Sequence, residues 1–492
     1  WLTINGYRFK ISVTYRYKRR DSEKVLSNLE AENKNSLKVL PNKTDYQRFN
    51  KNRMRLLQTS SLLLVSWLVL TGCASSQPTV STNKTESSWQ NLVATSSVFR
   101  QNHSGFALYD VEKQEMVAEY QSDRYFTPAS NTKLFSLYAG LCLLGDSIPA
   151  LRYTTKGDSL IFWGTGDPNL LHPDMPASNV FNVLKNWRGH LFYYPHNYLG
   201  KRFGPGWSWG DYPDYYQCEL SPLPLYGNFV RFTNNTVSPR IFKDSLRTAG
   251  WSEEFKLSRD EFNNGFYSTG WPSKSFSEDI PFHITSRLTA QLLADTLKKE
   301  VRLFPKTGLG RNFSTLYSLP VDTVYRRMLQ VSDNMLAEQI MLMCASKLDT
   351  NNTGFDMKMG IDYVKKNFLT DLPDEPIWED GSGLSRYNLF TPRSMVKLLQ
   401  KIYTKVPQQE RLFGLMSIGG KAGTIKNQYK SPVPFVFAKT GSLANVYCLS
   451  GYLRTKKGKV LIFSMMNGNF ISKTAVIRAE VERILREIYE KY

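Results

Sequence analysis

Hydrophobic and polar residues follow two different periods along this chain, and each period predicts its own elements. Apolar residues at helical spacing predict helices at 131–144, 285–301, 322–330, 334–347 and 475–491. Short apolar runs bounded by turn residues predict two strands within 105–120 and further strands at 435–438, 446–453 and 459–466. A polar turn separates the last two strands, which predicts a hairpin.

The middle of the chain has a different composition and a different hydrophobic pattern. Between 153 and 284, Gly, Pro, Asn and aromatic residues dominate, helical periodicity is scarce and short strands alternate with turns. We interpret 153–284 as one or two inserted β-rich domains. They separate 93–152 from 285–492, and we expect these two segments to form one discontinuous domain.

An apolar run from Leu62 to Leu70 follows Arg55 and ends in small residues. The run is too short to span a bilayer, and this arrangement is typical of a secretory signal. Leu70-Thr71-Gly72-Cys73 resembles the lipobox of bacterial lipoproteins, in which the cysteine is acylated and begins the mature chain. We therefore expect a signal peptide at 54–72, a lipid on Cys73 and a polar tether at 73–92. A short buried helix is the alternative interpretation.

Residues 1–53 precede this signal. Position 1 is Trp, and Met54 is the first methionine, so we interpret 1–53 as a misassigned upstream extension or a segment lost on processing. A cytosolic tail on an anchored protein is the alternative. The segment has a surplus of 8 basic residues, which leaves +12 of the net charge of +20 to the rest of the chain.

This moderately basic body suits an anionic cell envelope or an acidic polymer, and a solvated surface without a partner explains it equally well. The basic residues do not interleave with aromatic ones as in a nucleic-acid site, so we expect no nucleic-acid partner. A charged content of 22% with 41% hydrophobic residues excludes a disordered chain. We expect no cofactor and no metal. The remaining cysteines form no C-x-x-C pair, and their apolar surroundings predict buried free thiols; they are Cys142, Cys218, Cys344 and Cys448.

Ser130-Asn131-Thr132-Lys133 is an S-x-x-K motif at the start of a predicted helix. Residues three apart on a helix share one face, so the amine lies beside the hydroxyl. A serine hydroxyl is a weak nucleophile until a neighbour accepts its proton, and a lysine shielded from water can do so. A second match at 81–84 lies in the polar tether with no helix behind it, and we discard it.

Ser332-Asp333-Asn334 is an S-x-N motif between two predicted helices. A second serine at this place can relay a proton toward a leaving amine, and Asn334 can hold the lysine or the substrate amide. The alternative interpretation is that Ser332 or Asp333 caps the following helix, which is common.

Lys439-Thr440-Gly441 is a K-T-G motif that we place at the end of a strand. A strand edge can align an extended peptide, Lys439 and Thr440 can bind its terminal carboxylate, and Gly441 permits close approach of the backbone. The N–H of Ser442 can form an oxyanion hole with the N–H of Ser130. A strand end with a turn is the alternative. A second copy at 306–308 lies in a connector, and we treat it as a decoy.

Each motif is weak alone, but all three occur in one order and in the settings that they require. The set resembles the penicillin-binding proteins and serine β-lactamases. Four further segments resemble the penicillin-binding protein 4 type of D-alanyl-D-alanine carboxypeptidase/endopeptidase: 164–168 (G-T-G-D-P), 203–211 followed by 220–223, 332–338, and 380–386 (D-G-S-G-L-S-R) through 391–392 (T-P). The resemblance covers roughly 95–490.

This resemblance implies an α+β fold, with a five-stranded antiparallel sheet flanked by helices and built from both chain ends, and a β-rich insert after the S-x-x-K helix. It implies that Ser130 attacks the carbonyl between two D-alanines of a peptidoglycan stem peptide and forms an acyl-enzyme. Lys133 then accepts the proton, Ser332 and Asn334 complete the proton network, and Lys439 and Thr440 bind the carboxylate. β-Lactams are the implied inhibitors, and the implied location is the periplasmic side of the cell envelope.

Three alternatives stay open. A serine β-lactamase shares the motifs but is usually shorter and lacks a large insert. A Ser-His-Asp hydrolase fits G-W-S-W-G at 206–210, but that motif needs a strand before it and a helix after it, and only His283 follows it. A non-catalytic peptidoglycan-binding lipoprotein is the third. The sequence does not decide between carboxypeptidase and endopeptidase action, nor the oligomeric state or the membrane leaflet.

Overall fold

The computed structural model describes residues 2–4, 7–9 and 88–492, except for 251, 253, 271, 273, 274, 306 and 307. The chain divides into two compact units, Trp1–Thr82 and Asn83–Tyr492. In the first unit, only the antiparallel strands β1 (Leu2–Ile4) and β2 (Tyr7–Phe9) are described. The predicted signal peptide, Cys73 and most of the tether therefore lie outside the described residues.

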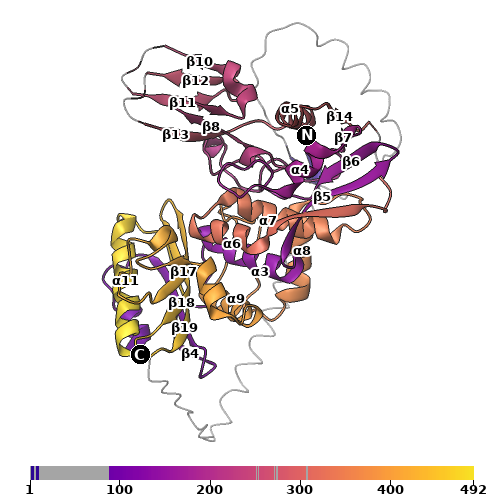
Figure 1. Ribbon diagram of the computed structural model, residues 1–492. Coiled ribbons are helices and arrows are strands. Elements are labelled where there is room, and N and C mark those ends of the chain that lie inside the picture. Colours follow the sequence, from indigo (N-terminus) through magenta and orange to yellow (C-terminus); the bar gives the residue numbers. More distant parts are fainter. Residues whose placement is uncertain are drawn as a thin grey trace, which may run out of the picture. The chain divides into compact units, whose positions relative to one another are not determined.

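The largest sheet of the second unit is antiparallel and draws its strands from both ends of that unit (Figure 1). Its order is β16-β17-β18-β19-β3-β4, with bounds Ser417–Ile418, Val436–Leu443, Val446–Arg454, Val460–Gly468, His103–Asp110 and Glu115–Tyr120. Strand β19 pairs with β3 from Leu461↔Asp110 to Gly468↔His103, which joins the two ends of the second unit. The α+β class is confirmed. The sheet has a sixth strand beyond the five expected, because the two-residue β16 is too short to leave a pattern.

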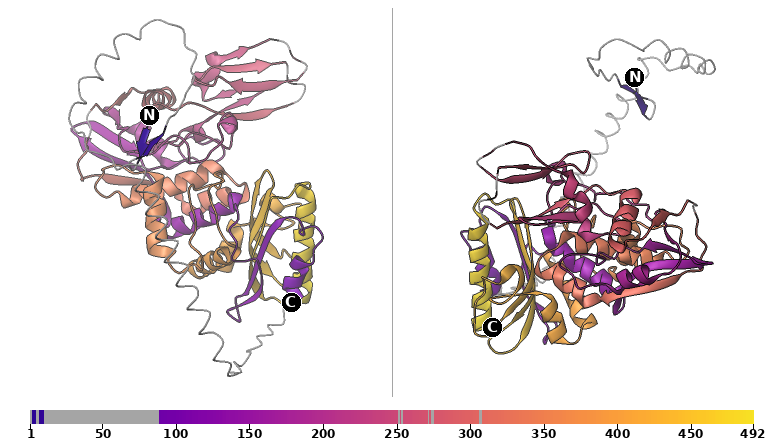
Figure 2. Two further views of the ribbon diagram at one scale, coloured as in Figure 1. Left: turned by 180° about the vertical axis from the view of Figure 1, so that it is seen from behind. Right: turned by 45° about the horizontal axis from the view of Figure 1, so that its top comes forward.

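Helices cover both faces of this sheet (Figure 2). On one face lies α11 (Thr474–Lys491), whose Ile477, Val481, Ile484 and Ile488 recur at helical spacing and are all buried. The short helix α2 (Ser88–Ala94) joins the same hydrophobic cluster. The other face packs on a separate helical core.

That helical core contains the two helices that carry the predicted motifs. They are α3 (Lys133–Leu143), preceded by the 3-10 turn η1 (Ala129–Thr132), and α7 (Asn334–Leu348), which follows α6 (Val321–Gln330). Three further helices complete the core: α8 (Met357–Phe368), α9 (Pro392–Lys405) and α10 (Gln409–Leu415). The hydrophobic pattern did not predict these three, although Thr391 capping α9 with Pro392 at its first position is a strong start signal.

The β-rich region is built from three small sheets. The first, β14-β7-β6-β5-β15, contains Val301–Leu303, Leu191–Tyr193, Ser159–Gly164, Ser147–Lys156 and Ser314–Pro320. The others are β13-β8-β9 (Ser277–Pro281, Phe229–Thr233, Val237–Ser238) and β10-β12-β11 (Leu246–Thr248, Phe266–Thr269, Lys256–Arg259). Two helices, α4 (Asn179–Asn186) and α5 (Ser286–Leu297), pack with them.

The first of these sheets takes strands from outside 153–284 on both sides. Strand β5 begins at Ser147 and pairs with β15, which lies near residue 320. The division of the chain into domains stays a prediction. No helix within the described residues is long and apolar enough to cross a membrane.

Candidate active site

Ser130 and Lys133 lie at the junction between η1 and α3, where the S-x-x-K motif predicted a helix start. The turn η1 carries Ser130, and Lys133 is the first residue of α3. The Nζ of Lys133 donates to Ser130 Oγ at 2.9 Å, to Asn334 Oδ1 at 2.7 Å and to the Ser382 carbonyl at 2.8 Å. One amine therefore contacts the candidate nucleophile and two other segments of the chain.

Burial controls the charge of Lys133. The side chain is fully buried, which lowers the pKa of Lys133 to about 8, although the nearby carboxylates Glu338, Asp380 and Asp333 oppose the shift. One pH unit below this pKa, about one molecule in ten still carries a neutral amine beside Ser130. Such an amine can accept the proton of the hydroxyl that it contacts.

The loop at 380–385 is shaped by two buried carboxylates, and it delivers the Ser382 carbonyl to Lys133. Glu338 accepts from the N–H groups of Gly381 and Ser382, both at 2.8 Å. Asp380 accepts from the N–H groups of Gly383 at 2.8 Å and Ser385 at 2.6 Å. Burial raises the pKa of both carboxyl groups. The sequence showed this loop as the D-G-S-G-L-S-R segment, without a role for Glu338, Asp380 or Ser382.

Ser332 and Lys439 form a second hydroxyl–amine pair. The Nζ of Lys439 donates to Ser332 Oγ at 2.9 Å and to the Thr440 carbonyl at 2.7 Å. Lys439 is fully buried, and burial together with the nearby Lys133 holds its pKa well below the usual value. Ser332 has φ +63°, and a residue other than glycine keeps this conformation only when its surroundings enforce it. Asp333 caps α7 by accepting from Leu336 N at 3.1 Å. The capping that was the alternative interpretation of this motif therefore occurs together with the contact between Ser332 and Lys439.

The K-T-G motif lies inside β17 and not at its end, which corrects our prediction. The apolar run stops at Ala438, but the backbone pairing with β18 continues through Lys439↔Ser450 and Gly441↔Cys448 to Leu443↔Val446. The pattern of side chains ended before the strand did, because the ladder depends on backbone groups that hydropathy does not report.

Gly441 lets this strand lie against the Ser130 turn. A Cβ at position 441 would lie 2.4 Å from the Pro128 carbonyl oxygen, so a larger residue does not fit. Asn131 Nδ2 donates to the Lys439 carbonyl at 2.9 Å and ties the turn to the strand. These contacts bring the first and third motifs together.

Thr440 and Ser442 face more open surroundings. Thr440 Oγ1 donates to Thr424 Oγ1 at 2.8 Å, and Thr424 lies in the 3-10 turn η5 (Gly423–Ile425). Ser442 is exposed, and Arg478 Nη2 lies 3.5 Å from its Oγ. Thr440 therefore contacts a neighbouring turn, and the Ser442 side chain lies beside α11. The sequence analysis did not single out Thr424, whose surroundings carry no recognisable pattern.

The segment 203–217 contacts two of the motif loops. Asn334 Nδ2 donates to the Tyr216 carbonyl at 3.0 Å, and Trp207 Nε1 donates to Asp380 Oδ2 at 3.0 Å. The segment is therefore fixed both to the S-x-N motif and to the loop that orients Lys133.

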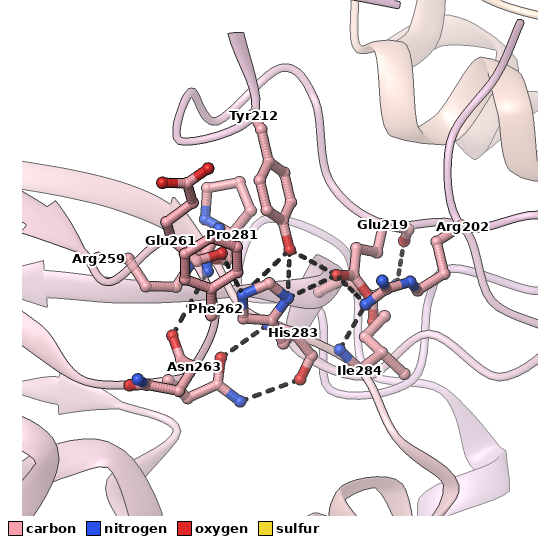
Figure 3. A network of polar contacts seen from close by, with 12 residues as sticks. Arg202, Tyr212, Glu219, Arg259, Glu261, Phe262, Asn263, Pro281, His283 and Ile284 are labelled. Carbon is pink, nitrogen blue, oxygen red and sulfur yellow. Dashed lines mark hydrogen bonds and ion pairs between the residues drawn. The ribbon is translucent and has the colours of Figure 1, made fainter. Parts of the chain in front are cut away.

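A buried polar network ties the same segment to the β-rich region (Figure 3). Glu219 accepts from Tyr212 Oη at 2.6 Å and from Ile284 N at 2.9 Å. The ring of His283 lies between Tyr212 and Glu219, with Nδ1 3.0 Å from Glu219 Oε1 and Nε2 3.0 Å from the Glu261 carbonyl. His283 thus has a structural set of partners. Ser208 only precedes the 3-10 turn η2 (Trp209–Asp211), which is not the strand–turn–helix that a Ser-His-Asp hydrolase requires.

Other sequence predictions have simpler outcomes. Cys218, Cys344 and Cys448 are buried free thiols as predicted, while Cys142 is half-buried. Within the described part of the chain, no cluster of three or more His, Cys, Asp or Glu side chains is arranged to hold a metal ion. The discarded motif at 81–84 lies outside the described residues, as do Lys306 and Thr307 of the decoy.

Comparisons with known proteins identify relatives that match most of the chain. The chain is 24% identical to the D-alanyl-D-alanine carboxypeptidase DacB of Haemophilus influenzae over 448 residues, covering 79% of this chain and 90% of that protein. It is 24% identical to the D-alanyl-D-alanine carboxypeptidase of Actinomadura sp. (strain R39) over 421 residues, covering 74% and 77%.

The fold matches a crystal structure of penicillin binding protein 4 from Haemophilus influenzae with a TM-score of 0.65 and 21% identity, covering 82% of this chain and 98% of the other. The model of the D-Ala-D-Ala carboxypeptidase 3 (S13) family matches residues 90–256 and 275–487, most of the chain. This match over most of the chain shows that the chain is a member of the D-Ala-D-Ala carboxypeptidase 3 (S13) family.

Proposed function

We propose that this protein is a serine D-Ala-D-Ala carboxypeptidase and/or endopeptidase, and that it acts on peptidoglycan stem peptides through an acyl-enzyme. The observation that carries the proposal is the 2.9 Å contact between Lys133 Nζ and Ser130 Oγ, beside the matching contact of Lys439 with Ser332. Family membership and the names of the relatives support the choice of substrate.

In the first step, the neutral amine of Lys133 takes the proton of Ser130. The Ser130 oxygen then attacks the carbonyl carbon between two D-alanines and forms a tetrahedral intermediate. The N–H groups of Ser130 and Ser442 stabilise the oxyanion. Gly441 lets β17 lie close to the Ser130 turn, which a shared oxyanion hole requires.

In the second step, the C–N bond breaks and the leaving amine needs a proton. Ser332 donates it, and the proton that Lys133 accepted in the first step replaces it by way of Lys439, whose Nζ contacts Ser332 Oγ. Asn334 holds Lys133 in place. The terminal carboxylate of the substrate binds beside Lys439 and Thr440. Water then attacks the ester of Ser130 and releases the shortened peptide.

β-Lactams have a strained amide in the place of the D-Ala-D-Ala bond, and we expect them to acylate Ser130. Labelled penicillin should form a stable adduct with the wild-type protein, and Ser130→Ala should abolish labelling while its thermal unfolding is unchanged. Ser147→Ala is a matched control and should be labelled like the wild type, because it removes an exposed serine hydroxyl at the start of β5, outside the proposed site. Labelling that persists in Ser130→Ala contradicts the assignment, and rapid hydrolysis of the penicillin instead of an adduct supports the β-lactamase alternative.

We also infer that the protein is exported to the cell envelope and anchored through a lipid on Cys73, on the periplasmic side of a membrane. The basis is the lipobox-like sequence at 70–73 and a peptidoglycan substrate. Mass spectrometry of the intact mature protein tests this together with the acylation, because it reports the first residue, the lipid and the penicilloyl group in one measurement. A mature chain that starts elsewhere than Cys73, or lacks the lipid mass, contradicts the anchor.

A further inference from the structure

A continuous line of ion pairs leads from the β-rich region to the S-x-N loop. Arg231 on β8 donates from Nε to Asp279 Oδ1 at 2.7 Å and from Nη1 to Asp174 Oδ1 at 2.6 Å. Arg327 on α6 continues the line, with Nη2 2.9 Å from Asp174 Oδ2 and Nε 3.4 Å from Asp333 Oδ2. Asp174 is thus shared by two arginines from different parts of the fold.

These side chains are shielded enough for the pairs to matter. Their exposed fractions lie between 16% for Asp333 and 29% for Asp174. Exposed surface pairs contribute little because water screens them, whereas partly buried pairs in a shared network are screened less. Hydrogen bonds from Arg231 lower the pKa of Asp174 to about 2, so this carboxylate stays charged wherever Lys133 titrates.

The line ends beside the strained residue of the site. Asp333 uses Oδ1 to cap α7, while Oδ2 faces Arg327. Ser332, its neighbour, holds φ +63°, a conformation that needs outside support in a residue other than glycine. A cavity of about 280 Å³ borders Ser332, Arg327 and Asp174, so packing does not supply that support on this side of the loop.

We propose that Asp174 and Arg327 are positioning residues that hold Ser332 where its hydroxyl can give a proton to the leaving amine. The proposal rests on the proposed function and adds to it a role for the β-rich region. Asp174 follows the G-T-G-D-P segment and belongs to none of the three motifs. Through Arg327 it acts on the orientation of Ser332 and touches no reacting atom.

The test compares two substrates that differ only in the leaving group. When a peptide ending in D-Ala-D-Ala reacts, its leaving group is the amine of the terminal D-alanine, which must be protonated as the C–N bond breaks. When the matching thioester reacts, its leaving group is a thiolate, which needs no proton because a thiol has a pKa of about 8.5. Asp174→Asn should lower kcat/KM for the amide by about 10- to 100-fold, since small misplacement of a proton donor has effects of this size. The kcat/KM for the thioester should change by less than about 3-fold.

Two further variants make the result decisive. Arg327→Lys keeps the positive charge but lacks the fork that reaches both carboxylates, and it should show the same selective loss. It also carries the test if Asp174→Asn does not fold. Asp295→Asn removes a carboxylate from the exposed Asp295–Lys298 pair on α5 and should leave both substrates unchanged.

An equal loss with both substrates, or no loss with either, overturns the positioning role. Failure of the proposed function gives a different result, because turnover of both substrates would then survive in Ser130→Ala. The ratio of kcat/KM for the amide to that for the thioester tests the positioning role only when turnover depends on Ser130. The two failures are therefore distinguishable.

Discussion

At the scale of single residues, the site depends on two lysines whose charge is controlled by burial. Lys133 and Lys439 are both fully buried, and each contacts a serine hydroxyl at 2.9 Å. Desolvation favours the neutral amine in both, and the carboxylates near Lys133 moderate the shift there. Lys133 is therefore the better placed of the two to change its protonation state within a catalytic cycle.

The rate of acylation should depend on pH through Lys133. The base is the neutral amine, and its pKa is lowered to about 8, so the neutral fraction falls as the pH drops below that value. We expect the second-order rate constant for acylation by a chromogenic β-lactam to rise about tenfold per pH unit below pH 8 and to level off above it. A stopped-flow series across this range measures the profile. A rate that is independent of pH, or that falls as the pH rises through 8, contradicts this role for Lys133.

At the scale of elements, the site forms where one strand packs against the start of one helix. Strand β17 carries Lys439 to Ser442, and η1 with α3 carries Ser130 and Lys133. Their approach depends on Gly441 and on the hydrogen bond from Asn131 to the Lys439 carbonyl. The separation of the two elements therefore sets the width of the proposed oxyanion hole.

Gly441→Ala should widen that gap and slow acylation. Its Cβ would lie 2.4 Å from the Pro128 carbonyl oxygen, so the strand or the turn must move. We expect acylation to slow by at least about tenfold, because displaced reacting groups lose alignment. Gly468→Ala, at the end of β19 with no atom near its added Cβ, is the matched control and should acylate like the wild type. The same rate in both variants contradicts the close approach.

At the scale of the whole second unit, the segments near its two ends stabilise each other. Strand β3 pairs with β19, and α11 packs its apolar side onto the sheet that they form (Figure 1). The final residue, Tyr492, donates from Oη to Asp110 Oδ2 at 2.6 Å at the end of β3. The S-x-x-K helix follows directly on β3 and β4, so its position depends on residues near the C-terminus.

Removing the contacts of α11 should destabilise this unit. Ile484→Ala deletes a fully buried side chain, and such substitutions cost about 2–5 kcal/mol of the free energy of unfolding. Val476→Ala on the same helix is the control, because Val476 is 45% exposed and its loss should change the free energy by less than about 0.5 kcal/mol. Urea denaturation followed by circular dichroism compares the two. Equal midpoints would show that α11 does not stabilise the sheet.

Much of the local structure could be predicted from the sequence, because it depends on nearby residues. The strands at 105–120, 446–453 and 459–466 and the helices around 334–347 and 475–491 appear close to their expected bounds. The motifs S-x-x-K, S-x-N and K-T-G also predicted candidate catalytic groups, since spacing on one helical turn or one strand is a local property. The helices α8 and α9 were missed although their capping residues were visible.

The sequence alone predicted which groups are candidates for the chemistry, and that a helix starts at the S-x-x-K motif. Only the tertiary structure decided which groups tune and hold them. Ser382 and Tyr216 reach the site from distant segments, and the ion pair between Asp174 and Arg327 joins residues 153 positions apart. The physical reason is that burial, ladder pairing and charge contacts depend on distances between segments, and no local pattern of residues records those distances.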